Sequence, residues 1–67
     1  MKTGFFSHTI QISKTEKIKL SVFKKYDTFF MEEKHNDRVV YALPFNNLAD
    51  SLVELYHKAM EYEEVLS

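Results

Sequence analysis

Apolar and polar side chains alternate along much of the first half of the chain. Between Phe5 and Ile12, one set of alternate positions holds Phe6, His8, Ile10 and Ile12. Between Lys17 and Tyr26, the same period places Ile18, Leu20 and Val22 on one face. A period of two is typical of a β-strand with one buried face. The pattern therefore predicts two strands, joined by the polar turn at residues 13–16.

Two further strands are predicted at residues 28–34 and 38–43. The first of them has two possible inner faces, Phe29, Met31 and Glu33 or Thr28, Phe30 and Glu32. The first set is favoured, because it holds two apolar residues. In the second strand one face carries Val39, Tyr41 and Leu43. Pro44 is expected to end this strand, because proline has no N–H to donate to the ladder.

A helical repeat replaces the alternation from residue 46 to residue 65. Asn47 is a candidate N-cap, with Asp50 at the position of a capping box. One apolar stripe contains Leu48, Leu52, Leu55, Ala59, Tyr62 and Leu66, and a second contains Ala49, Val53, Tyr56 and Met60. Such a wide apolar face either covers one sheet face entirely or packs in part on a second copy of the chain. The candidate residues for helix packing and dimerisation are Leu48, Leu52, Leu55, Tyr56, Ala59 and Tyr62.

The order of these elements predicts a single α+β domain over residues 1–67. Its four strands, within residues 5–43, are joined by short connections, which favour an antiparallel meander over parallel pairing. The helix at 46–65 completes a ββββα arrangement.

Composition excludes several kinds of chemistry. The 67 residues contain no cysteine and only one glycine, which argues against disulfides, thiolate metal sites and phosphate-binding glycine loops. Glu54 and His57 have the spacing of two helical metal ligands, but a single helix supplies too few ligands for such a site. We therefore expect no metal, no cofactor and no enzymatic activity. With no signal peptide or long apolar run, the expected location is the cytoplasm, away from membranes.

The net charge of −1 conceals an uneven distribution. Residues 1–25 hold six lysines and one glutamate, whereas residues 26–67 hold three basic and nine acidic residues. Lys17, Lys19 and Lys25 fall on the outer face of the second strand with Phe23 between them, and Phe30 can join them from the next strand. Lysines attract phosphates and exposed aromatic rings stack on unpaired bases. These five residues form the candidate nucleic-acid site.

The stretch from Lys17 to Tyr26 resembles the second strand of a PUR repeat. Phe5-Phe6-Ser7 and the helix from Leu48 to Met60 also fall where that pattern has its first strand and its helix. The whole chain is similar in topology to the PUR, positive-cofactor-four and Whirly group of single-strand binders. The resemblance implies a curved antiparallel sheet that binds single-stranded DNA or RNA, backed by a helix that often dimerises. By this analogy Lys17, Lys19, Phe23 and Lys25 contact the strand and Phe30 stacks on a base.

Two functions follow from these patterns. The first is a small homodimeric binding protein for single-stranded nucleic acid, acting as an accessory in transcription or replication. The alternative is a protein-interaction module, an inhibitor or adaptor of phage or mobile-element origin. In that case Glu61, Glu63 and Glu64, or an exposed sheet edge, meet a basic partner.

Overall fold

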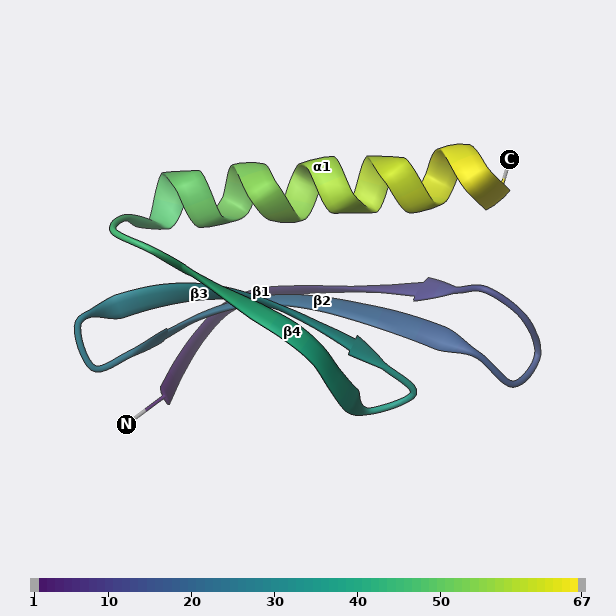
Figure 1. Ribbon diagram of the computed structural model, residues 1–67, viewed down its shortest axis with the longest axis horizontal. Helices are drawn as coiled ribbons and strands as arrows, with labels where there is room; N and C mark the ends of the chain where they lie inside the picture. The colour runs from purple at the N-terminus through teal and green to yellow at the C-terminus, as the bar shows by residue number, and fades with distance from the viewer. Residues whose placement is uncertain (1, 67) are drawn as a thin grey trace.

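The computed structural model describes residues 2–66 and contains four strands and one helix (Figure 1). The strands are β1 (Lys2–Gln11), β2 (Lys17–Lys25), β3 (Thr28–His35) and β4 (Arg38–Phe45), followed by the helix α1 (Leu48–Leu66). They form one antiparallel sheet in the order β1-β2-β3-β4. The predicted ββββα meander is confirmed.

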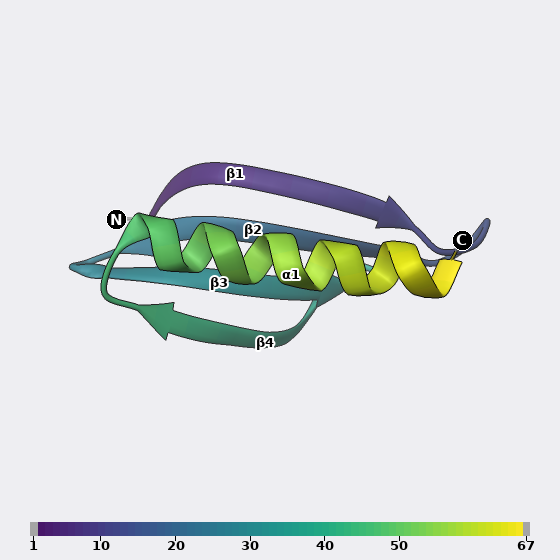
Figure 2. The ribbon, with the colours of Figure 1, turned by 90° about the horizontal axis from the view of Figure 1, so that it is seen from above.

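The core lies between the helix and the two central strands. Seen from above, α1 runs along the length of β2 and β3, while β1 and β4 lie on either side (Figure 2). Leu20, Val22 and Met31 are completely or almost completely buried there. Val22 pairs with Met31 in the β2–β3 register, so the favoured inner face of β3 is confirmed.

The helix begins with the capping arrangement that the sequence predicts. The backbone N–H of Asp50 donates to Asn47 Oδ1 at 2.8 Å, and Asn47 Nδ2 donates to Asp50 Oδ2 at 3.0 Å. Leu55 and Ala59 are buried against the sheet, with Leu48, Leu52 and Tyr62 partly buried beside them. The first apolar stripe therefore covers the sheet as far as Tyr62, whereas its last member Leu66 and Val53, Tyr56 and Met60 of the second stripe are exposed.

A buried carboxylate fastens the far half of the helix to the sheet. Glu33 of β3 faces the helix, and its Oε2 accepts a 2.5 Å hydrogen bond from the hydroxyl of Tyr62. Burial, together with this bond, raises the pKa of Tyr62 to about 12. Burial and the nearby Glu33 charge also raise the pKa of Tyr41, which lies opposite Glu33 on β4. A hydrogen bond to a charged group is stronger than one between neutral groups, so this contact fixes where α1 sits.

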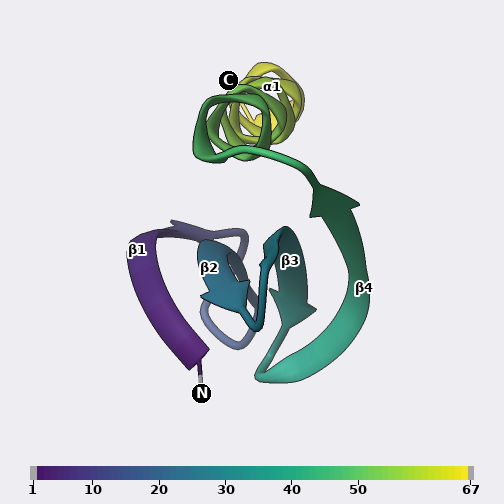
Figure 3. The same ribbon diagram turned by 90° about the vertical axis from the view of Figure 1, so that its left-hand side faces the viewer.

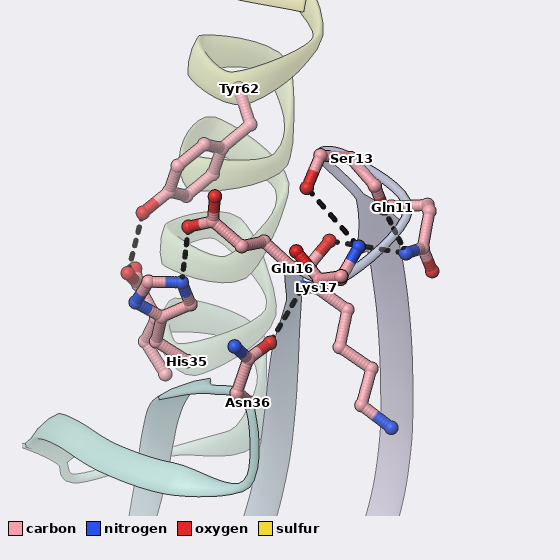
Figure 4. A network of polar contacts seen from close by, with 9 residues as sticks. Gln11, Ser13, Glu16, Lys17, His35, Asn36 and Tyr62 are labelled. Atoms are coloured by element: carbon pink, nitrogen blue, oxygen red, sulfur yellow. Dashed lines mark hydrogen bonds and ion pairs between the residues drawn. The ribbon is translucent and has the colours of Figure 1, made fainter.

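Polar contacts join the two loops at one end of the sheet (Figure 4). Glu16, in the loop between β1 and β2, lies 3.2 Å from His35 Nε2 at the end of β3. The backbone N–H of Lys17 donates to Asn36 Oδ1 at 2.8 Å, and the N–H of Asn36 donates to the carbonyl of Lys17 at 3.0 Å. Asn36 and Asp37 both have positive φ angles, as a tight type I′ hairpin requires.

Details of two strands and of the helix differ from the sequence prediction. β1 starts at Lys2 rather than Phe5, because a bulge between Gly4 and Phe6 lets the pairing with β2 continue to Lys25. β4 extends through Pro44 to Phe45, since an edge strand has only one neighbour to bond and tolerates proline there. The helix starts two residues later and ends one residue later than expected.

The predicted common face of Val39, Tyr41 and Leu43 is also wrong. Lys34 pairs with Val39, whereas the preceding Glu33 pairs with Tyr41, so β4 has one extra residue at this point. The bulge turns Val39 to the side opposite Tyr41 and leaves Val39 and Val40 exposed.

Candidate nucleic-acid interface

The sheet face opposite the helix is open and concave. Viewed from the end, the N-terminal end of β1 and the start of β4 curve beneath β2 and β3, away from α1, while the end of β4 rises toward the helix (Figure 3). We call this side of the sheet the outer face. The β1–β2 and β2–β3 registers place on it one lysine of β1, three of β2 and one of β3, namely Lys2, Lys17, Lys19, Lys25 and Lys34.

The lysines of the outer face are mostly not engaged with carboxylates. Lys17 Nζ lies 4.0 Å from Asp37, and Lys34 Nζ lies 3.8 Å from Glu32. Within residues 2–66, no carboxylate lies within ion-pair distance of Lys2, Lys19 or Lys25. The face therefore presents positive charge that an anionic partner can neutralise.

The prediction that Phe23 offers an exposed ring for base stacking is wrong. Phe23 does lie on the outer face, but only 7% of it is exposed. Its ring stacks on Phe30 with centroids 5.4 Å apart, and Lys2 Nζ lies 4.2 Å from its centroid. A cation over an aromatic ring is held by the ring's quadrupole, so Lys2 covers the surface that a base would need. Phe30 remains half-buried at the rim of this pair.

Small side chains leave a hollow in the middle of the outer face. In one row across the four strands, the small residues Ser7, Ser21 and Ala42 lie beside Glu32. Gly4 pairs with Phe23 in the next row, and a Cβ placed on it would meet nothing within 4 Å. A hollow of about 570 Å³ opens over β1, β2 and β3, and a smaller one of about 270 Å³ lies between Phe30 and Ala42. The larger has the size of a small-molecule pocket.

Opposite charges lie on opposite sides of the molecule. The helix, on the other side of the sheet, carries five acidic residues, Asp50, Glu54, Glu61, Glu63 and Glu64, and one lysine, Lys58. Within residues 2–66, the strand positions of the outer face hold five lysines and one carboxylate, that of Glu32. A polyanion approaching this molecule is therefore attracted to the outer face and repelled from the helix.

A third hollow, with an apolar lining, lies between the helix and β1 on the other side of the sheet. It measures about 490 Å³ and is lined by Phe6, His8, Leu52, Leu55, Tyr56, Ala59, Met60 and Glu63. Phe6 is 51% exposed, although the alternation predicts it on the buried face, because α1 lies over β2 and β3 and leaves this edge uncovered. Of the six candidate packing residues, Tyr56 alone is exposed, and it lines this groove.

The described residues were also compared with the requirements of a metal site and of a membrane-spanning helix. Between Lys2 and Leu66, no group of three His, Cys, Asp or Glu side chains is placed to hold a metal ion, the Glu54 and His57 pair included. In the same range, the helix is too polar to cross a membrane.

Sequence reasoning missed three members of the outer face, Lys2, Lys34 and Glu32. Lys34 and Glu32 alternate with the predicted inner residues Phe29, Met31 and Glu33 of β3. The choice of that inner set therefore already implies that both lie on the outer face. Lys2 joins the face only through the bulge of β1, which the sequence pattern does not reveal. Comparisons of the chain with protein-family models, curated proteins and solved structures find no match. The similarity to PUR repeats therefore stays a prediction.

Proposed function

We propose that this protein binds single-stranded nucleic acid along the outer face of its sheet. The observation that carries the proposal is the gathering of five lysines from three strands on one concave surface, with the acidic residues of the helix on the opposite side. Lysines neutralise phosphates and release their counterions, which is the main source of affinity in non-specific nucleic-acid binding.

The hollow favours a single strand over a duplex. In a single strand the bases are unstacked and can turn into a cavity, whereas in a duplex they remain paired. The hollow of about 570 Å³ lies among the lysines, with Lys2, Lys19 and Lys34 all on its lining. Because Phe23 is covered, stacking is limited to Phe30, and binding depends mainly on the phosphates.

The direct test is fluorescence anisotropy of labelled single-stranded and double-stranded oligonucleotides at several salt concentrations. We expect single strands of DNA or RNA to bind more tightly than duplexes. If all five lysines contact phosphates, log Kd against log salt has a slope of magnitude about 3.5. Equal or tighter binding of duplexes contradicts the single-strand proposal, and no binding at low salt contradicts nucleic-acid binding altogether.

Two variants with the same change of charge separate a local contact from a general electrostatic effect. Lys19→Glu alters an unpaired lysine in the outer face, and Lys58→Glu alters a lysine of the helix. We expect the first to weaken binding at least tenfold and the second to leave it nearly unchanged, with the circular dichroism spectra of both unaltered. Equal losses in the two variants indicate that only net charge matters.

We also propose that two copies pair through the groove beside β1. The groove is apolar and its rim carries exposed Phe6, Tyr56 and Met60, which is unusual for a surface that faces only water. Sedimentation equilibrium tests this. Tyr56→Lys should shift the protein to monomer, whereas Val65→Lys, at an even more exposed apolar position near the end of the helix, should not. A wild-type protein that stays monomeric at high concentration overturns the pairing.

A further inference from the structure

One carboxylate lies in the middle of the outer face. Glu32 of β3 is only 9% exposed, yet it lines both hollows of that face. Its neighbours across the sheet are Ser21 on β2 and Ala42 on β4, whose short side chains do not reach over it. The negative charge of Glu32 repels phosphates, so this side chain does not help the surface to attract a polyanion. Its position therefore suggests contact with a different part of a ligand.

The carboxylate of Glu32 has acceptor positions to spare. Lys34 Nζ lies 3.8 Å from its Oε1, too far for a hydrogen bond, and no side chain or backbone group of residues 2–66 donates one to it. An ionised carboxylate only accepts hydrogen bonds, and its two oxygens can receive two parallel donors. An occupant of the hollow that engages both oxygens of Glu32 at once must therefore present a pair of donors.

Among the parts of a single-stranded nucleic acid, guanine presents such a pair. Its N1–H and its 2-amino group point the same way along the Watson–Crick edge, which is free in a single strand. Cytosine and adenine each offer one amino group beside a ring nitrogen that accepts, and thymine offers one N–H between two carbonyls. Phosphates carry no donor and are repelled by the carboxylate.

The neighbours of Glu32 along β3 suit a nucleotide in this position. Phe30 and Lys34 lie two residues before and two residues after it, on the same face and about 6–7 Å away along the strand. A base whose edge meets Glu32 thus lies next to the half-buried Phe30 ring, and its phosphate lies within reach of Lys34. The three side chains supply an apolar surface, an acceptor and a cation in one line.

We infer that Glu32 makes this surface selective for guanine in single strands. The inference rests on the proposed function and adds base selectivity to it. The guanine edge donates its N1–H and 2-amino hydrogens to the two oxygens of Glu32, while the lysines hold the phosphates.

The test compares otherwise identical oligothymidylates that carry one central base. Anisotropy is measured for strands with central guanine, hypoxanthine, adenine, cytosine or thymine. We expect guanine to bind about tenfold more tightly than thymine, as one good bidentate contact contributes. Hypoxanthine lacks only the 2-amino group and should lose most of that advantage.

Glu32→Gln is the matching protein variant, and Asp27→Asn in the β2–β3 turn is the control with the same change of charge. The Glu32 variant should bind guanine and thymine strands about equally and the thymine strand no more weakly than wild type does. The Asp27 variant should keep the preference. Tight binding without preference for guanine overturns the inference and leaves the proposed function standing. No binding of any strand overturns both.

Discussion

The two faces of the sheet are made from the same strands but differ in burial and in the side chains they carry. On the face toward α1, Leu20, Val22 and Met31 are excluded from water, and burial of apolar surface holds the domain together. On the outer face the alternate residues of the same strands are lysines, the stacked pair Phe23 and Phe30, and small polar side chains beside an open hollow. Lys19 is thus exposed on the outer face, whereas Leu20, the next residue, is buried in the core.

This difference means that substitutions can test stability and the proposed binding separately, even in a very small protein. A domain of 67 residues has a thin core, and its net stability is typically only a few kcal/mol. Under the helix, the side chains over β2 and β3 are tightly packed, because unfilled space there costs stability. The outer side, which contributes little to the core, is free to carry unpaired lysines and an empty hollow.

The largest effect should come from truncating the core. Leu20→Ala removes a fully buried side chain and should lower the free energy of unfolding by about 3 kcal/mol. Its neighbour Lys19→Ala should change it by less than about 0.5 kcal/mol, because that side chain is exposed on the other face. Urea unfolding followed by circular dichroism measures both. Similar losses in the two variants would show that the outer face also supports the fold.

Removal of one hydroxyl should have the next largest effect. Tyr62→Phe deletes the donor to Glu33, whose other oxygen has no hydrogen-bond partner in the part of the chain that the structure describes. We expect a loss of about 1–2 kcal/mol in urea unfolding at neutral pH. Tyr56→Phe is the control, since its hydroxyl belongs to an exposed side chain, and it should cost almost nothing. If both variants unfold like wild type, the contact does not hold the helix.

Because of Tyr62, the free energy of unfolding should fall as the pH becomes strongly alkaline. In the folded protein the pKa of Tyr62 is raised from 10.0 to about 12, so the folded state holds the proton more tightly than the unfolded state. The stabilisation is therefore complete below pH 10 and is lost as the pH rises toward 12. The difference in urea midpoint between wild type and Tyr62→Phe should shrink over that interval. A constant difference from pH 8 to pH 11 would contradict this assignment.

The helix-facing half of the structure was largely predictable from the sequence. Alternation placed Ile18, Leu20 and Val22 correctly, and Asn47 with Asp50 marked the start of the helix, because these signals depend only on neighbours along the chain. Errors arose at the bulges near Gly4 and Val40, where one extra residue reverses the faces. A bulge depends on how two strands pair and leaves no periodic trace in either strand alone.

The candidate site was only partly predictable for a related reason. The lysines of β2 were found because their own strand arranges them, but the burial of Phe23 results from Phe30 on one neighbouring strand and Lys2 on another. Alternation tells which face a residue occupies and not what covers it there. The central position of Glu32 likewise depends on small residues contributed by three other strands.

The smallest expected effect is an increase in the free energy of unfolding, whereas truncation of the core lowers it. This opposite sign distinguishes the outer face from the core. Gly4→Ala adds one methyl group on the outer face, where its Cβ meets nothing within 4 Å. The φ angle of Gly4 is not positive, so alanine fits without strain and only restricts the unfolded chain. We expect the free energy of unfolding to rise by about 0.5 kcal/mol, measured by urea unfolding. A loss of stability instead would mean that the outer face is as tightly packed as the core, and the open hollow on which the binding proposal depends would then be absent.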